Sequence, residues 1–198
     1  MSFIQKQRRE QMIKASIETL AVIGYQKLTF KNIAERINVN PSLVSYHFKS
    51  KEALLYELLI YILEHKTHYI EEGIKNYHTA PERLKAFIEV SLNYHETHRD
   101  ENTALIEIIF NMRTDDGKAL YMQVDDEPDA IHDLFKGIIK AGIREGVFNE
   151  NIDVEALNTI VNGSIDERML LNTGDKDNQA FTEVLLLMVN QYIEPGRR

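Results

Sequence analysis

The chain has 198 residues, with 23 Lys and Arg side chains against 31 Asp and Glu, so its formal charge is −8. A chain of this length forms one domain or two small ones, and it can bury a core without disulfides. It contains no Cys, which excludes disulfides, thiolate metal sites and cysteine nucleophiles, and its acidic balance argues against nucleic acid as a partner.

Three helices are predicted in the N-terminal part, the second and third of them short. Apolar residues recur at three- and four-residue spacings over 8–23 and over 30–37, which is the period of a helix with one buried face. Thr29 precedes the second helix as an N-cap. Asn40 and Pro41 supply an N-cap and a first-turn proline for a third helix. The short interval between the second and third helices predicts a tight turn.

Longer helices follow, separated by polar segments. The same periodicity predicts helices over 51–76, 81–98, 101–112, 128–146, 154–171 and 179–193. The segments 114–127 and 172–178 are polar and are predicted to be a loop and a turn. Because no strand alternation of useful length occurs, the predicted fold class is all-α with about nine helices.

The charge is unevenly distributed along the chain. Residues 1–51 contain nine basic and three acidic side chains, a charge of +6. The other 147 residues contain 14 basic and 28 acidic side chains, a charge of −14. A basic segment on an acidic body is typical of a protein in which one part meets a polyanion. The distribution therefore reverses the indication from the total charge.

The basic segment has the pattern of a helix-turn-helix, two short helices joined by a turn of about four residues. Asn38 is the turn residue that best tolerates a left-handed backbone, and Gly24 ends the preceding helix. A helical wheel gives the second helix a polar arc of Pro41, Ser42, Ser45 and Tyr46 and an inner arc of Leu43, Val44, His47 and Phe48. The small polar arc can approach bases in a major groove. Phosphates can be neutralised by flanking lysines, namely Lys31, Lys49 and Lys51.

Several short motifs follow one another in this segment. They are Gly24-Tyr25 with Leu28-Thr29, then Ile33-Ala34, then Val39, and finally His47-Phe48 through Leu55. In this order they resemble the DNA-binding domain of the tetracycline-repressor (TetR) family of bacterial transcriptional regulators, over about residues 8–55. The sequence departs from the family pattern at Ser45, where Tyr or Phe is common, and at Asn38, where Gly is usual.

The resemblance implies an N-terminal three-helix helix-turn-helix domain over 5–55 and a helical effector-binding and dimerisation domain over 56–194. It implies a homodimer that binds a palindromic double-stranded DNA operator as a repressor and is released by an unknown small-molecule effector. The sequence does not itself distinguish repression from activation. The implied DNA-binding residues are Thr29, Lys31, Asn40, Pro41, Ser42, Ser45, Tyr46, His47 and Lys51. The family pattern implies that His47 contacts DNA, whereas the helical wheel places His47 on the inner arc.

The helix over 154–171 is apolar on two faces, which calls for two packing partners. One stripe contains Val154, Leu157, Val161, Ile165 and Arg168, and the other contains Ala156, Ile160, Gly163 and Leu170. The helix over 179–193 carries Val184, Leu185, Leu187, Met188 and Tyr192. As in the family, these two helices are expected to form a four-helix dimer interface. The alternative is that both stripes face the interior of a single subunit.

Few residues of the acidic part indicate a ligand. The candidates are polar or aromatic groups on otherwise apolar stripes, namely Ser91, Tyr94, His95, Phe110, Phe135 and Arg168. Arg168 can pair with a carboxylate of the ligand, or as easily with Asp166 or Glu167. No cofactor is predicted.

Two other classes of function compete with a DNA-binding regulator. A metal-binding helical enzyme needs a ligand motif, but His95 and His98 are one residue too close for H-E-x-x-H. A helical interaction protein that never touches DNA would not need the basic segment. The sequence therefore predicts no catalytic residue and no metal site.

The location of the protein follows from its apolar stretches. None approaches the roughly 20 residues that cross a bilayer, and no signal-peptide pattern is present. The sequence therefore predicts a cytoplasmic protein without a membrane partner.

Overall fold

The computed structural model describes residues 3–114, 117–122, 129–171 and 178–194. Within these ranges the chain forms nine α-helices and one 3-10 turn, with no β-strand beyond an isolated bridge between Arg113 and Ala119. None of the described helices has both the length and the hydropathy that a bilayer crossing requires. The predicted all-α class is confirmed.

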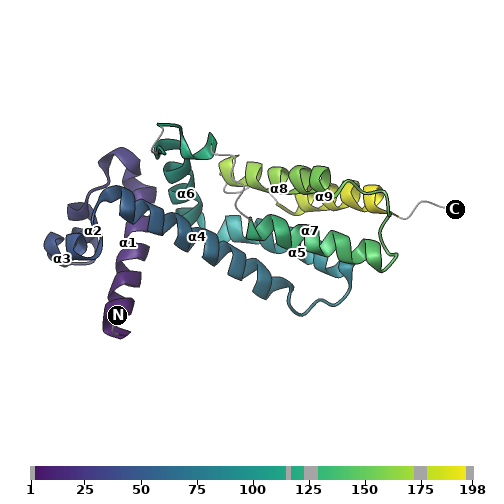
Figure 1. Ribbon diagram of the computed structural model, residues 1–198, viewed down its shortest axis with the longest axis horizontal. Coiled ribbons are helices and arrows are strands. Elements are labelled where there is room, and N and C mark those ends of the chain that lie inside the picture. Colours follow the sequence, from purple (N-terminus) through teal and green to yellow (C-terminus); the bar gives the residue numbers. More distant parts are fainter. Residues whose placement is uncertain (1–2, 115–116, 123–128, 172–177, 195–198) are drawn as a thin grey trace. The chain divides into compact units, whose positions relative to one another are not determined.

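The predicted helices all occur, with their ends displaced by a few residues. In chain order they are α1 (Phe3–Lys27), α2 (Phe30–Arg36), α3 (Pro41–His47), α4 (Lys51–Ile74), α5 (Ala80–Thr97), α6 (Arg99–Asn111), the 3-10 turn η1 (Leu120–Met122), α7 (Ala130–Arg144), α8 (Val154–Leu171) and α9 (Asn178–Ile193) (Figure 1). The predicted loop over 114–127 contains η1, and the rest of it lies partly outside the described residues, as does most of the turn over 172–178. Helix α5 begins before Pro81 because Thr79 and Glu82 form a capping box, in which the Glu82 carboxylate accepts from the Thr79 N–H at 3.2 Å.

Packing divides the chain into two compact units. The N-terminal unit comprises residues 1–65 and 98–125, and the C-terminal unit comprises residues 66–97 and 126–198. Helix α4 contributes its first residues to the N-terminal unit and its last residues to the C-terminal unit. Helix α6, which comes from the acidic part of the sequence, belongs to the N-terminal unit with the basic segment.

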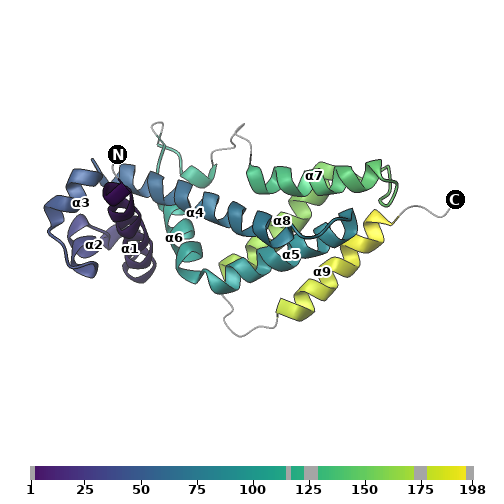
Figure 2. The same cartoon turned by 90° about the horizontal axis from the view of Figure 1, so that it is seen from below.

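The N-terminal unit is built around α1. This helix contacts α2 and α6, and α2 contacts α3 (Figures 1 and 2). Its core is formed by fully buried side chains from α1, α2, α4 and the link between α1 and α2, including Met12, Leu20, Leu28, Ile33, Leu54 and Leu58. Burial of such side chains stabilises the unit by about 1.5–3 kcal/mol each relative to full exposure.

Helix α5 is the central element of the C-terminal unit. It contacts α7, α8 and α9, and α7 also contacts α8. The Phe87 and Phe135 rings meet here with their centroids 5.3 Å apart. At the end of α7 the packing is close, because a Cβ atom added to Gly142 would lie 2.1 Å from the Phe148 ring.

We expect Gly142→Ala to lower the free energy of unfolding by about 1–3 kcal/mol, because the added methyl overlaps the Phe148 ring. Gly137 on the same helix is the matched control, since a Cβ atom there meets nothing within 4 Å. Gly137→Ala should instead raise the free energy of unfolding by about 0.5–1 kcal/mol, through the lower backbone entropy cost of alanine. Urea denaturation at one fixed protein concentration measures both, and equal effects of the two substitutions would contradict the packing at Gly142.

Candidate nucleic-acid interface

The two helices of the predicted helix-turn-helix begin at side-chain caps. The Thr29 hydroxyl accepts from the Asn32 N–H at 3.2 Å, and the Asn32 side chain accepts from the Thr29 N–H at 3.1 Å. At the start of α3 the Asn40 side chain accepts from the Ser42 N–H at 2.9 Å, and Pro41 occupies the first turn. Both predicted N-caps are therefore confirmed.

The turn between α2 and α3 depends on Asn38. Its φ of 53° places it in the left-handed region, where Asn is among the few non-glycine residues that fit readily. The next residue is hydrogen-bonded to α2, since the Val39 N–H donates to the Ala34 carbonyl at 2.9 Å. Asn38 thus performs the role of the glycine that is usual at this position, as its conformational preference predicts.

The polar arc of α3 is exposed. Tyr46 is 76% accessible, and Pro41, Ser42 and Ser45 are exposed beside it. The Ser45 hydroxyl bonds within its own helix, to the Ser42 carbonyl at 3.1 Å. On the other side of the helix Val44 and Phe48 are buried. The polar arc is therefore exposed as predicted, whereas Leu43 and His47 of the inner arc are only half-buried. An arc of small side chains with one aromatic is left to meet a partner.

His47 lies at the edge between the two arcs. It is half-buried, and its ring centroid is 5.4 Å from that of Tyr46 and 6.4 Å from that of Phe48. The His47 carbonyl accepts from Arg9 Nη1 at 2.8 Å. The intermediate exposure explains why the wheel and the family pattern give opposite indications for this residue.

Arg9 is a structural residue that the sequence did not reveal. Besides the His47 carbonyl, its guanidinium binds the Glu57 carboxylate of α4 and lies 4.6 Å from the Phe48 ring centroid. It therefore joins α1 to α4 and to the end of α3. Nothing in the sequence pairs Arg9 with a carboxylate 48 positions away.

Lys51 also makes internal contacts. Its ammonium donates to the Tyr25 carbonyl and lies 4.4 Å from the Tyr25 ring centroid. Burial lowers the pKa of Lys51, which the nearby Glu52 carboxylate partly opposes. Tyr25, whose carbonyl accepts from Lys51, also donates its own N–H to the Glu107 carboxylate of α6 at 2.8 Å. The backbone of Tyr25, which follows Gly24 with its φ of 76°, is thus hydrogen-bonded to side chains of both α4 and α6. Contact of Lys51 with phosphate stays a prediction.

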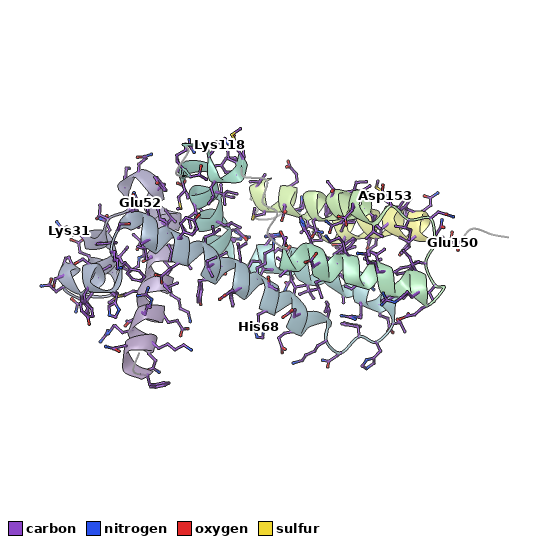
Figure 3. The ribbon with its side chains drawn as sticks, in the orientation of Figure 1. Lys31, Glu52, His68, Lys118, Glu150 and Asp153 are labelled. Carbon is purple, nitrogen blue, oxygen red and sulfur yellow. The ribbon has the colours of Figure 1, made fainter. Side chains whose placement is uncertain are left out.

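The remaining predicted contacts are exposed on the surface of α2 and its surroundings. Lys31 projects from α2 and is 3.8 Å from Glu35 on its own helix (Figure 3). Thr29, Asn40 and Lys49 are exposed as well. These side chains can reach a phosphate backbone without any rearrangement of the core.

The ligand candidates separate into two groups. Ser91, Tyr94 and His95 of α5 are buried in the C-terminal unit, as is Phe135 of α7. Phe110 differs, because it lies in the N-terminal unit on the face of α6 opposite its buried residues, is 44% accessible, and packs on Tyr121 with centroids 4.8 Å apart. Phe110 therefore belongs to a different unit from the other candidates.

Arg168 lies between the two last helices. Its guanidinium carbon is 5.2 Å from the ring centroid of Phe181 on α9. This cation–π contact is a structural use that the sequence interpretation did not include. Elsewhere in the described ranges, no group of three or more His, Asp or Glu side chains is arranged as a metal site.

The two stripes of α8 have different environments. The first is turned inward, with Leu157, Val161 and Ile165 buried. The second is exposed, with Ile160 57% accessible and Ala156, Gly163 and Leu170 also on the surface. Helix α9 likewise exposes Val184, Met188 and Leu187, the last 68% accessible. The alternative that both stripes face one subunit's interior is therefore wrong.

Two family models match the chain. The model for bacterial regulatory proteins of the tetR family matches residues 12–58, and the model for a tetracyclin repressor-like C-terminal domain matches residues 77–167. The first match contains most of α1, all of α2 and α3 and the start of α4, and the second contains α5, α6, α7 and most of α8.

Individual proteins are similar over most of the chain. The fatty acid metabolism regulator protein of Bacillus subtilis is 27% identical over 165 residues, which are 82% of this chain and 83% of the relative. The crystal structure of FadR from B. subtilis in complex with stearoyl-CoA has a TM-score of 0.77 at 24% identity and covers 94% of this chain and 100% of its own. A regulator from Saccharomonospora viridis in complex with choline has a TM-score of 0.75 at 19% identity and covers 98% of this chain and 100% of its own. At these identities the solved structures show a shared fold.

Proposed function

Because the chain belongs to the tetR family of bacterial regulatory proteins, we propose that it represses transcription as a homodimer on a palindromic operator. In outline it is a ligand-responsive, DNA-binding transcriptional regulator. The observation that carries the proposal is the exposed arc of α3, capped by Asn40 and flanked by exposed lysines. DNA contact would involve residues 5–55, with effector binding and dimerisation in residues 56–194.

Base recognition would take place through α3. Its N-terminal residues Pro41, Ser42 and Ser45 are small enough for the helix backbone to approach base edges in a major groove. Tyr46 would contact a thymine methyl or donate to a phosphate, and Lys31 and Lys49 would neutralise phosphates beside it. In the dimer the two α3 helices would lie about 34–36 Å apart, one helical turn of DNA.

Dimerisation would bury the outer stripe of α8 against α9 of a second copy. Exposed residues on both helices support this, namely Ile160, Gly163 and Leu170 on α8 and Leu187 and Met188 on α9. Exposed apolar residues that gather on a helix face often mark a site of contact with another protein chain. The Tyr192 hydroxyl accepts from the Asp153 N–H at 3.2 Å within the chain, so Tyr192 would lie at the edge of such an interface.

The effector would be a compound with a fatty acyl chain. The relative that matches along most of its length carries the name fatty acid metabolism regulator, and B. subtilis FadR was crystallised with stearoyl-CoA. Binding of such a compound would release the operator, provided that the DNA-bound and free states bind it with different affinity. Since the relatives are transcriptional regulators, the chain would have no catalytic role and would act on DNA in the bacterial cytoplasm.

We expect binding to DNA from upstream of the protein's own gene to weaken steeply with salt. A dimer that contacts about 6–10 phosphates loses roughly 10³–10⁵ in affinity between 50 and 200 mM salt, because the release of counterions from DNA into solution is less favourable at higher salt. Gel shifts across this range measure the slope, with unrelated DNA of equal length as the control. Equal affinity for both DNAs at every salt concentration would refute the proposed operator.

A further inference from the structure

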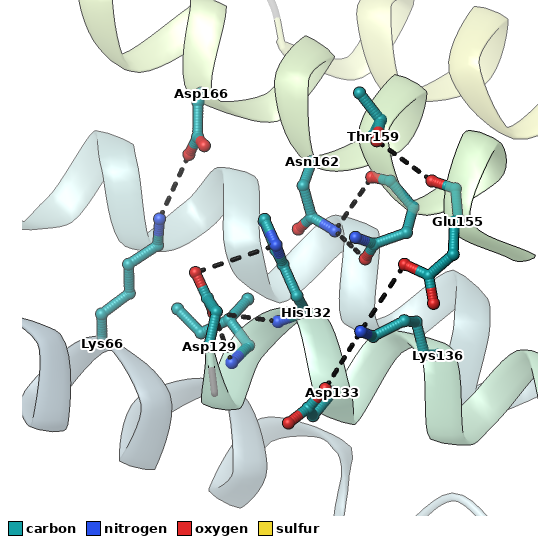
Figure 4. Close-up of polar contacts among 11 residues, drawn as sticks. Lys66, Asp129, His132, Asp133, Lys136, Glu155, Thr159, Asn162 and Asp166 are labelled. Atoms are coloured by element: carbon teal, nitrogen blue, oxygen red, sulfur yellow. Dashed lines mark hydrogen bonds and ion pairs between the residues drawn. The ribbon is translucent and has the colours of Figure 1, made fainter. Parts of the chain in front are cut away.

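A small group of polar side chains lies inside the C-terminal unit. Lys66 comes from α4, Ser91 and His95 from successive turns of α5, and Asp166 from α8. Lys66 Nζ donates to Asp166 Oδ1 at 3.3 Å (Figure 4), and His95 Nε2 lies 3.8 Å from the same oxygen. Lys66, Ser91 and His95 are all buried. Two nitrogen atoms from different helices thus converge on one carboxylate oxygen.

Hydrogen-bond donors exceed acceptors in this group. The Lys66 ammonium can donate three hydrogen bonds, and among the described residues it makes only the one to Asp166. The Ser91 hydroxyl is 2% accessible and has no partner in the same part of the chain. A buried ammonium and a buried hydroxyl are unfavourable unless their hydrogen bonds are made. The group therefore has unused capacity to bind an acceptor, most of all an anionic one.

Solvent reaches the group at Asp166. The side chain of this residue is 46% accessible, whereas those of Lys66 and His95 are almost completely covered. An anion arriving along this side would encounter Asp166 first and Lys66 behind it. Since the exposed carboxylate can be solvated by water, Lys66 can exchange it for another acceptor at low cost.

From this arrangement we propose that Lys66, Ser91 and His95 form the receptor for an anionic head group of the effector, a carboxylate or a phosphate. The anion replaces Asp166 as the acceptor of Lys66, and Ser91 and His95 donate to it. A cationic head group is excluded from this position, because it would meet the Lys66 ammonium in a desolvated environment. The inference rests on the proposed function, in that it assigns the head-group chemistry of the ligand to which the regulator responds.

The exchange also changes a contact between helices. In the free protein the Lys66–Asp166 pair links α4 to α8. A bound anion takes Lys66 out of this pair, so α8 loses its charged contact with α4. The ligand then binds best to the state in which the pair is broken, which supplies the differential affinity that a switch needs.

Equilibrium dialysis with three radiolabelled probes tests the receptor. The probes are myristate, myristoyl-CoA and the uncharged methyl myristate, each at submicromolar concentration. We expect the wild-type protein to bind at least one of the anions about 10-fold or more tightly than the methyl ester. Preference for myristate identifies a carboxylate as the bound group, and preference for myristoyl-CoA identifies a phosphate.

Three substitutions should change the affinity for the preferred anion in different ways. Lys66→Met should weaken binding of the preferred anion at least about 10-fold, whereas Asp166→Asn should strengthen it roughly 3-fold or more by removing the competing carboxylate. Ser91→Ala should weaken binding about 3–10-fold without lowering the Tm, because the hydroxyl has no partner in the free protein. Lys75→Met is the matched control, since Lys75 lies in the turn directly after α4, pairs with Glu72 at the surface, and should leave binding unchanged when replaced.

The outcomes separate this inference from the proposed function. The proposed receptor is wrong if the protein binds all three probes equally or binds none of them. It is also wrong if Lys66→Met leaves the affinity for the anion unchanged, or if Asp166→Asn lowers that affinity. Gel shifts on the same proteins judge the regulator separately. If the anion releases the operator from wild-type and Lys66→Met protein alike, the receptor is wrong and the regulator stands. If the substitutions act as expected but the anion leaves operator affinity unchanged, the receptor stands and induction fails.

Discussion

Replacing Ser45 with Glu should reduce operator affinity by at least about 100-fold, close to 2.7 kcal/mol. Ser45 is exposed in the polar arc of α3, and among the described residues its hydroxyl bonds only to carbonyls of that helix. A carboxylate there would face the phosphates on each side of the groove, and like charges at an interface cost several kcal/mol. A dimer carries the substitution twice, which increases the loss.

Val22→Glu is the matched control for this effect. Val22 is also exposed in the N-terminal unit, but it lies on α1 and outside the arc, and the charge change is identical. Both variants should unfold within about 0.5 kcal/mol of the wild-type protein, as exposed substitutions usually do. Gel shifts at one salt concentration compare them, and equal losses for the two variants would show that total charge matters and α3 does not.

Replacing Gly163 with Leu should raise the dimer dissociation constant by at least about 100-fold, because a side chain inserted between closely packed helices forces them apart. Within one chain the position is open, since a Cβ atom at Gly163 meets nothing within 4 Å. Leu is also a better helix former than Gly, so the subunit itself should not be destabilised. The loss should therefore be confined to contacts with a second copy.

Sedimentation velocity at micromolar concentration measures this effect. Gly137→Leu is the matched control, because Gly137 is an exposed glycine of α7 with equally open surroundings and lies outside the proposed interface. The Gly163→Leu protein should sediment as a monomer and bind the operator weakly, while Gly137→Leu remains a dimer. A Gly163→Leu protein that sediments as a dimer would place the interface elsewhere.

The DNA-binding segment could be predicted well because its features are local. The N-caps at Thr29 and Asn40, the left-handed Asn38 and the buried face of α3 all depend on residues within about four positions of one another. Helical periodicity and capping chemistry describe such relationships directly.

The sequence was less informative about the charged residues of the same segment. Its charge of +6 counts Arg9, Arg36 and Lys51, yet all three are used internally. Arg9 binds Glu57, Arg36 binds Glu18 at 3.1 Å and Thr19 at 2.9 Å, and Lys51 binds the Tyr25 carbonyl. A charge count treats every cation as available, whereas only the fold shows which carboxylates and carbonyls come within reach.

The sequence by itself determined the helices, the turn, the arcs of α3 and the two stripes of α8, because each follows from the 3.6-residue period and from neighbours along the chain. Only the tertiary structure decided which stripe of α8 stays exposed, that Phe110 belongs to a different unit from the other ligand candidates, and that Lys66 meets Asp166 100 positions away. Those outcomes depend on which helix faces come together, and helix periodicity specifies an apolar face without specifying its partner.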